Sequence, residues 1–248
     1  MKIRNTAAHR FVVSRLLWAT GLSPILTIPA NGYRLRFYPT AISAAMWCDP
    51  RYYERDEAAL KWLLGPGDNF VDVGANVGVL TLAGSTLVGS QGRVFSIEAH
   101  PKIAKYLDAN VKLNRAEHVQ VIHAAVGDRN GEAHLSDRRS DDQNAISADG
   151  LTVPLRTLDS LLPDIPIRVL KIDVEGFELF VLNGAQRVLQ RTDYVYFESW
   201  ERHFVKFGYG TREVIRFLKD RGFCIGRDEG HVSHECENLL AVKDGAQA

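Results

Sequence analysis

The chain has 248 residues, 46% of them hydrophobic and 24% charged, a composition typical of one α/β domain with a sizeable core. Lys and Arg together number 30, and so do Asp and Glu, and this balance argues against non-specific binding of nucleic acid. The three cysteines are widely spaced and form no CxxC pair, which argues against a zinc site or a disulfide framework. We therefore expect a reducing, cytoplasmic location.

Residues 1–50 are expected to form an N-terminal extension, and residues 51–248 the main domain. The first 15 residues include four basic and no acidic side chains. The apolar stretch 16–30 is too short for a membrane span, which needs roughly 20 residues, and it makes only a weak secretory signal. We expect a helix over 11–22 that packs on the domain. The alternative is a basic helix that touches a membrane surface or a partner.

From residue 68 onward, short apolar runs alternate with helical patterns, which predicts repeated βα units. The first expected strands are 69–73, 93–98 and 119–123, with helices over 79–88 and 101–114 between them. Later strands are expected at 169–173 and 194–198, and later helices at 179–190 and 211–221. A polar stretch, 136–150, is flanked by segments 133–136 and 151–155, which are expected to pair as an accessory hairpin.

The pattern of the C-terminal residues predicts how the sheet ends at one edge. Segments 223–227 and 238–242 read as strands with no helical pattern between them, so they should be antiparallel neighbours. We therefore expect a Rossmann-like α/β fold with a mostly parallel seven-stranded sheet, an antiparallel C-terminal strand and helices on both faces.

The loop DVGANVG at 72–78, between the first strand and its helix, carries most of the functional information. Glycines let the backbone turn tightly and approach a ligand, and the start of the helix offers N–H groups to a carboxylate such as that of methionine. A nicotinamide site would need G-x-G-x-x-G, but Asn76 stands at the second glycine, and the Gly-Lys-Ser/Thr of a P-loop is absent. The alternative is a glycine-rich turn used for packing alone.

Two strand ends extend this site. Glu98 ends the second strand about 20 residues after the loop, the usual place for a carboxylate that binds both ribose hydroxyls. Beyond the third strand, Asp128 would accept a hydrogen bond from an adenine amino group, and Val126 would pack on the ring. The alternatives are an exposed glutamate at a strand end and, for Asp128, a plain turn.

The segment KIDVEGFE at 171–178 follows a central strand. Ligands of open α/β sheets bind beyond the carboxyl ends of such strands, so Asp173 and Glu175 should face the reacting end of the cofactor. Their charge suits a sulfonium and an ammonium group. Glu178 is the best candidate for simply capping the next helix.

Together these segments resemble the FkbM family of methyltransferases. The matching parts lie in order along the chain: LGPGD at 64–68, VDVGANVG at 71–78, FSIEAHP at 95–101, LDSLL at 158–162 and, most specific, LKIDVEGFE at 170–178, which continues into VLNGA at 181–185. The resemblance covers about residues 51–198 and implies the class I methyltransferase fold with S-adenosylmethionine as methyl donor. His100 departs from the family's usual asparagine. Family members methylate hydroxyls of sugars or polyketides and sometimes peptide amides, so the resemblance does not identify the acceptor.

These arguments define the expected site. S-adenosylmethionine should be bound by Asp72, Gly74, Asn76, Gly78, Glu98, Ala99, Val126, Asp128 and Asp173. The expected catalytic residues, which would accept the proton of the acceptor, are Asp173, Glu175 and Glu198, with His203 a weaker choice. Asp173 with Glu198 would alternatively hold a divalent ion, but because no third ligand is evident we expect no metal.

The sequence therefore predicts an S-adenosylmethionine-dependent methyltransferase that acts on a hydroxyl of a sugar or a secondary-metabolite-like acceptor. The alternatives are an N-methyltransferase acting on a peptide or amide and a non-catalytic protein that binds S-adenosylmethionine. The expected partner is thus a small-molecule, glycan or peptide acceptor, with no nucleic acid and no integral membrane segment. Segments 136–150 and 47–54 are expected to select the acceptor, and the sequence leaves the oligomeric state open.

Overall fold

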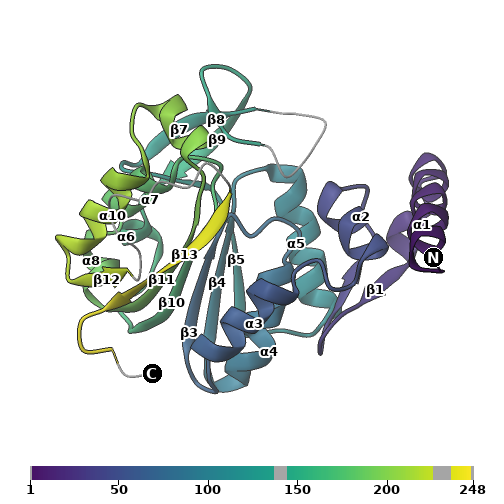
Figure 1. Cartoon of the computed structure of the whole chain (residues 1–248), viewed down its shortest axis with the longest axis horizontal. Coiled ribbons are helices and arrows are strands. Elements are labelled where there is room, and N and C mark those ends of the chain that lie inside the picture. Colours follow the sequence, from purple (N-terminus) through teal and green to yellow (C-terminus); the bar gives the residue numbers. More distant parts are fainter. Residues whose placement is uncertain (1, 137–143, 226–235, 247–248) are drawn as a thin grey trace.

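A computed structural model describes residues 2–136, 144–225 and 236–246 of the chain. Figure 1 shows a central sheet with helices on both faces. Among the described residues this sheet has seven strands in the order β12-β13-β11-β10-β3-β4-β5. The strands are β3 (Asn69–Val73), β4 (Arg93–Glu98), β5 (Val119–His123), β10 (Ile167–Ile172), β11 (Thr192–Ser199), β12 (Phe223–Ile225) and β13 (Glu237–Lys243).

Strand direction changes at β13. In the described part of the chain, the strand pairs β11–β10, β10–β3, β3–β4 and β4–β5 are parallel, whereas β13 is antiparallel to both β11 and β12. The sequence predicted a mostly parallel sheet, and the sheet is mixed. The predicted antiparallel C-terminal strand is confirmed.

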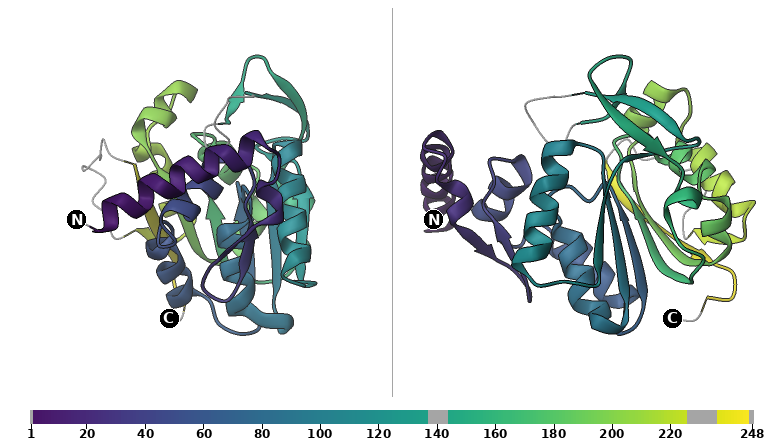
Figure 2. Two further views of the ribbon diagram at one scale, coloured as in Figure 1. Left: turned by 90° about the vertical axis from the view of Figure 1, so that its right-hand side faces the viewer. Right: turned by 180° about the vertical axis from the view of Figure 1, so that it is seen from behind.

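Helices cover the two faces of the sheet separately (Figures 1 and 2). One face carries α3 (Glu54–Leu63), α4 (Val79–Val88), which leads into η2 (Gly89–Gln91), and α5 (Pro101–Leu113). The other carries α6 (Leu158–Leu161), α7 (Glu178–Asn183), α8 (Gln186–Gln190) and α10 (Thr211–Lys219). Side chains alternate between faces along a strand, so Phe70 packs into one core cluster and its neighbour Val71 into the other.

The helix predicted over 179–190 is in fact two helices, α7 and α8, interrupted at Gly184 and Ala185. At this point the chain passes close to the loop that follows β6. A Cβ atom on Gly184 would lie 2.0 Å from the carbonyl oxygen of Gly127. The interruption therefore coincides with a tertiary contact that the helical periodicity of the segment does not contain.

A second, four-stranded sheet has the order β6-β9-β7-β8. Its strands are β6 (Ala125–Val126), β7 (Gly131–Leu135), β8 (Ile146–Ser147) and β9 (Leu151–Arg156). Strands β7 and β9 pair antiparallel, which confirms the predicted accessory hairpin. Of the polar segment between them, residues 137–143 lie outside the described residues.

The N-terminal elements lie at one end of the molecule (Figure 2). They are α1 (Lys2–Ala19), η1 (Ser23–Ile25), the paired strands β1 (Thr27–Pro29) and β2 (Arg34–Arg36), and α2 (Ala41–Cys48). The helix starts nine residues earlier than the predicted Phe11, because the sequence before that residue contains neither Pro nor Gly to end it. The described ranges contain no helix long and apolar enough to cross a membrane.

Contacts tie these elements to the rest of the chain. The indole of Trp47 in α2 donates to the carbonyl of Arg10 in α1 over 3.1 Å. In β2, the backbone N–H of Arg36 donates to the side chain of Asn110 in α5 over 2.8 Å, and Asn110 itself is fully buried. The division of the chain at residue 50 remains a prediction.

Candidate active site

The carboxyl ends of the central strands open into a cavity of about 1020 Å³. Its floor is formed by the loop after β3, the end of β4, the start of β6, the loop after β10 and the end of β11. Side chains outside the main sheet complete the wall, among them Tyr52, Tyr53, residues 144–148, Trp200, Arg202 and Phe207. This is the edge at which open α/β sheets bind ligands.

Most of the expected site residues line this cavity: Gly74, Asn76, Glu98, Ala99, Val126, Asp173, Glu175 and Glu198. Asp72, Gly78 and Asp128 do not. Asp128 is paired with its neighbour Arg129 over 3.1 Å, and it is the arginine that reaches the cavity wall. The roles assigned to these residues remain predictions.

Asp72 belongs to a buried ionic group beneath the cavity floor. Its side chain is fully buried, accepts a 2.6 Å hydrogen bond from Thr81, and lies 3.1 Å from the Lys171 ammonium. Lys171 also lies 3.6 Å from Asp173 and donates to the carbonyl of Gly74 over 3.0 Å. Burial opposes the charge of Lys171, but the two aspartates outweigh it and raise its pKa. Lys171 therefore stays charged and braces the loops after β3 and β10 together.

Sequence reasoning gave Lys171 no role. The available signal was a lysine in the middle of an apolar strand, since buried lysines are rare unless they are paired. Its partner Asp72 was assigned to the cofactor, whereas its contacts are with the protein interior.

Gly74 and Gly78 both have the positive φ that glycine adopts most readily, +75° and +94°. A Cβ atom on Gly74 would lie 1.8 Å from the backbone oxygen of Asp173, so two loops touch there. A Cβ atom on Gly78, the residue before α4, would lie 2.6 Å from the side chain of Leu107. Packing between loops therefore requires Gly74 independently of any ligand.

Glu98 is held at the end of β4 by two backbone donors. One carboxylate oxygen accepts from the N–H of Asn76 over 2.9 Å and the other from the N–H of His100 over 2.7 Å. Burial raises the pKa of Glu98 to about 7. Each carboxylate oxygen can accept a further bond, so the group is placed to receive two hydroxyls from the cavity, as a ribose would offer.

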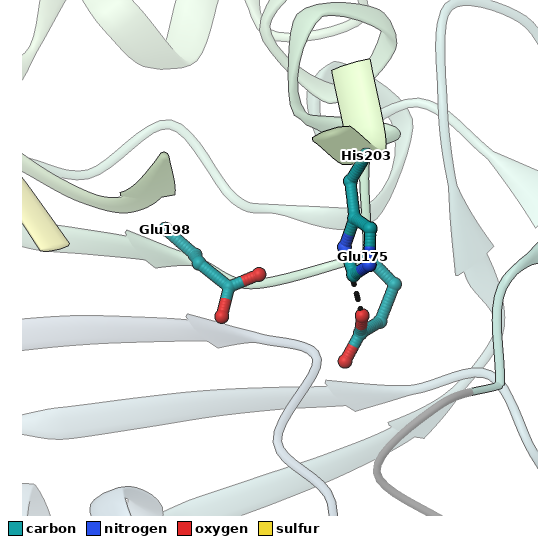
Figure 3. A group of neighbouring side chains, drawn as sticks. All are labelled: Glu175, Glu198 and His203. Carbon is teal, nitrogen blue, oxygen red and sulfur yellow. Dashed lines mark ion pairs between the residues drawn. The ribbon is translucent and has the colours of Figure 1, made fainter. Parts of the chain in front are cut away.

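The opposite end of the cavity gathers acidic groups and an imidazole (Figure 3). Glu175 comes from the loop after β10, Glu198 from the end of β11, and His203 from α9 (Glu201–Phe204), which continues into η4 (Val205–Phe207). One potential ligand atom from each of the three lies within 4.8 Å of the other two. The Nδ1 atom of His203 is 3.1 Å from a carboxylate oxygen of Glu175.

The loop that presents Glu175 is held in an unusual conformation. Glu175 has φ +56°, which costs a non-glycine residue about 1–2 kcal/mol, and Gly176 follows with φ +102°. A Cβ atom on Gly176 would lie 2.8 Å from the carbonyl oxygen of His203, so the loop packs directly on α9. The Tyr209 hydroxyl donates to the Gly176 carbonyl over 2.6 Å. Tertiary contacts therefore maintain the strained backbone and bring Glu175 to His203.

The surroundings shift the pKa values of two members of this group, Glu198 and His203. Burial, and then the nearby charge of Asp173, raise the pKa of Glu198 to about 7, and the thiol of Cys236 donates to one of its oxygens over 3.1 Å. Burial, followed by Lys206 and Arg202, lowers the pKa of His203 to about 4, so its imidazole is neutral at pH 7. In the described part of the chain, Glu198 has no ion pair with Lys or Arg within 4.0 Å.

Glu178 has a different environment from the other acids of the motif. It is the first residue of α7, is fully buried, and accepts a hydrogen bond from the N–H of Val174 over 2.9 Å. Burial raises its pKa to about 8. Its contact is thus with the loop that precedes the helix, and α7 has no side-chain cap, so the expected capping role of Glu178 is not what the structure shows.

Residues 72–225 match the family model of the methyltransferase FkbM domain. No curated protein matches the chain. Among solved structures, an FkbM methyltransferase of Methylobacillus flagellatus is similar, with a TM-score of 0.50 and 18% identity over 81% of this chain and 53% of that one. A proposed rRNA methylase of Clostridium thermocellum gives a TM-score of 0.51 and 14% identity over 77% and 94% of the two chains. At these identities the two structures share the fold with this chain.

Proposed function

This chain belongs to the FkbM methyltransferase family, and we propose that it transfers a methyl group from S-adenosylmethionine to a hydroxyl of a sugar or of a secondary-metabolite-like acceptor. The observation that carries the choice of a hydroxyl is the acidic end of the cavity, where Asp173, Glu175 and Glu198 line the wall. A hydroxyl loses its proton as it attacks, and a carboxylate within reach accepts it.

The order of the strands supports an orientation for the donor. Glu98 is the last residue of β4 and Glu198 the last but one of β11, and β3 and β10 lie between these strands. At a spacing of about 4.8 Å per strand, the ends of β4 and β11 stand about 14 Å apart along the sheet. Glu98 would bind the ribose, the N–H groups at the start of α4 the methionine carboxylate, and Asp173 the positively charged end. The acceptor would then approach from β11.

The residues present fit this donor. The two carboxylate oxygens of Glu98 are positioned by two backbone N–H groups and can accept hydrogen bonds from ribose hydroxyls. Gly74 has no side chain, so a ligand can approach the backbone at the cavity floor. S-adenosylmethionine supplies an electrophilic methyl carbon attached to sulfur. The acceptor oxygen bonds to that carbon as the carbon–sulfur bond breaks and its electron pair stays on sulfur. The chain's contribution is to align the two groups and to take the hydroxyl proton on Asp173.

Side chains from outside the main sheet support a polar, ring-containing acceptor. Tyr52 and Trp200 line the cavity, and aromatic faces of this kind stack on sugar rings. Residues 144–148 of the polar segment line it too, as do the cationic Arg129 and Arg202. We propose these elements as the acceptor-selecting part of the site, and we keep the cytoplasmic location as a prediction.

The test is methyl transfer to a mixed panel of sugars, hydroxylated natural products and peptides, followed by mass spectrometry of the products. We expect one added methyl group on an oxygen of a hydroxylated acceptor. Methylation confined to peptide nitrogen would replace the proposal with the N-methyltransferase alternative. Binding of S-adenosylmethionine without turnover on any class would favour a non-catalytic binding protein.

A further inference from the structure

Glu175, Glu198 and His203 come from three separate elements and meet in the acceptor half of the cavity (Figure 3). On the sequence alone we expected no metal, because Asp173 and Glu198 lacked a third ligand. The fold supplies a different set, with two carboxylates and one imidazole. Such a set of oxygen and nitrogen donors binds divalent cations of the Mn²⁺ and Zn²⁺ class.

The spacing of the donor atoms fits a common cation. Two ligands that each lie about 2.1 Å from a cation are about 3.0 Å apart when adjacent and about 4.2 Å apart when opposite. The 3.1 Å between His203 Nδ1 and the Glu175 oxygen corresponds to adjacent ligands, and the remaining separations lie within 4.8 Å. The three side chains therefore lie within reach of one ion.

The orientation of His203 gives a second, independent indication. Its Nδ1 atom is buried and forms no hydrogen bond of acceptable geometry among the described residues, although the Glu175 oxygen is only 3.1 Å away. A neutral imidazole that carried hydrogen on Nδ1 should point it at this oxygen. Because the bond direction at Nδ1 misses that oxygen, Nδ1 is a buried ring nitrogen without a hydrogen-bond partner among the described residues, and its lone pair is available to a cation.

The strained loop adds a third observation. Glu175 occupies an unfavourable backbone region, and the close contact of Gly176 with the His203 backbone keeps it there. Strain of this kind concentrates at functional sites, where the surrounding structure maintains a required geometry. Here that geometry is the approach of one carboxylate to one imidazole.

We propose that Glu175, Glu198 and His203 bind one divalent cation, which coordinates the acceptor oxygen and lowers the pKa of the hydroxyl. The catalytic part of this proposal rests on the proposed hydroxyl methylation. The cation takes no electrons. It withdraws charge from the oxygen, the proton passes to Asp173, and the oxygen then bonds to the methyl carbon as the carbon–sulfur bond breaks.

The site is tested by direct binding, without acceptor or methyl donor. The full-length chain is treated with a chelator and titrated with Mn²⁺, while the electron paramagnetic resonance signal of free Mn²⁺ is recorded. We expect saturation at one ion per chain. Glu175→Gln and Glu198→Gln each keep side-chain size and should weaken Mn²⁺ binding about tenfold or more. Glu132→Gln, the same change at an exposed residue of β7, should bind as the parent does.

Affinity for S-adenosylhomocysteine is measured for every variant and reports whether its fold is intact. If Glu175→Gln no longer binds S-adenosylhomocysteine, the Mn²⁺ affinity of Glu198→Gln tests the proposed site. The proposal is overturned if Mn²⁺ and Zn²⁺ do not bind saturably at millimolar concentration, or if they bind equally to both glutamine variants and the parent. Its catalytic part is overturned if chelator leaves hydroxyl methylation unchanged. An acceptor panel that yields only N-methylated peptide rejects the proposed function and leaves the binding site standing.

Discussion

The two ends of the cavity are built in different ways. The end proposed to bind the donor consists of the loop after β3 and Glu98 at the end of β4, and backbone N–H groups and glycine shape these two neighbouring segments. The acceptor end consists of side chains from the loop after β10, the end of β11 and α9. A site built from backbone groups changes little when side chains are substituted, so it suits a ligand that stays the same. A site made of side chains on separate elements can be altered without disturbing the segments at the other end.

The largest effect should come from Glu198→Gln at the acceptor end. Loss of this carboxylate should remove a ligand of the proposed cation, which helps the hydroxyl to give its proton to Asp173, and should lower kcat by about 10²–10⁴-fold, the range typical of groups that assist proton removal. Affinity for S-adenosylhomocysteine should stay within about threefold of the parent, a difference of under 1 kcal/mol. Single-turnover methyl transfer and calorimetry measure the two quantities. An equal loss of both would mean that the two ends are not separable.

Gly74→Ala should disturb the fold of the donor end as well as binding. A Cβ atom there would lie 1.8 Å from the Asp173 backbone oxygen, in addition to the cost of a positive φ, so unfolding free energy should fall by about 2–5 kcal/mol. Gly67→Ala is the matched control, because Gly67 also has a positive φ but no atom within 4 Å of its Cβ position. It should lose only about 1–2 kcal/mol in urea unfolding. Equal losses of unfolding free energy in the two variants would mean that the contact with Asp173 adds nothing to the cost of the substitution.

Glu98 should make donor binding dependent on pH. Its pKa in the unliganded protein is raised to about 7, and ribose hydroxyls bind the ionised form, so binding releases a proton below that pH. Affinity for S-adenosylhomocysteine should be constant above pH 7 and fall as pH decreases, by up to about tenfold per unit. Calorimetry across pH 5.5 to 8.5 (roughly 1.5 units on either side of the pKa) measures this. Glu98→Gln should bind about tenfold or more weakly at pH 8 and show a flat profile; a persisting slope would assign the proton to another group.

Asp128→Asn should have the smallest effect. The sequence predicted an adenine contact for this residue, but its carboxylate pairs with Arg129 and does not line the cavity. We expect the affinity for S-adenosylhomocysteine to change by less than about 0.5 kcal/mol, as for an ordinary surface substitution. A tenfold loss in calorimetry would restore the adenine contact and extend the donor end beyond Glu98.

Local patterns were enough to bring the loop after β3 and Glu98 to the cavity, where we propose that the donor binds. Strand periodicity, the glycine loop and the position of Glu98 all lie within about 30 residues, and neighbouring parallel strands bring their carboxyl ends to one edge. Helix α4 and strands β3, β4 and β5 have the predicted bounds for the same reason. The prediction of one helix over 179–190 was wrong. The helix is interrupted where Gly184 contacts the distant Gly127, and no local pattern contains that contact.

By itself, the sequence determined the fold class, the methyltransferase family and the strand ends that carry Glu98, Asp173 and Glu198, because these follow from periodicity and from motifs within single βα units. Only the tertiary structure decided that His203 meets Glu175 and Glu198, and that Asp72 pairs with Lys171. Those pairings depend on how α9 packs on the loop after β10 and on which face of the sheet each side chain occupies. Both are set by contacts between residues far apart in the chain, and such contacts have no signature in local sequence.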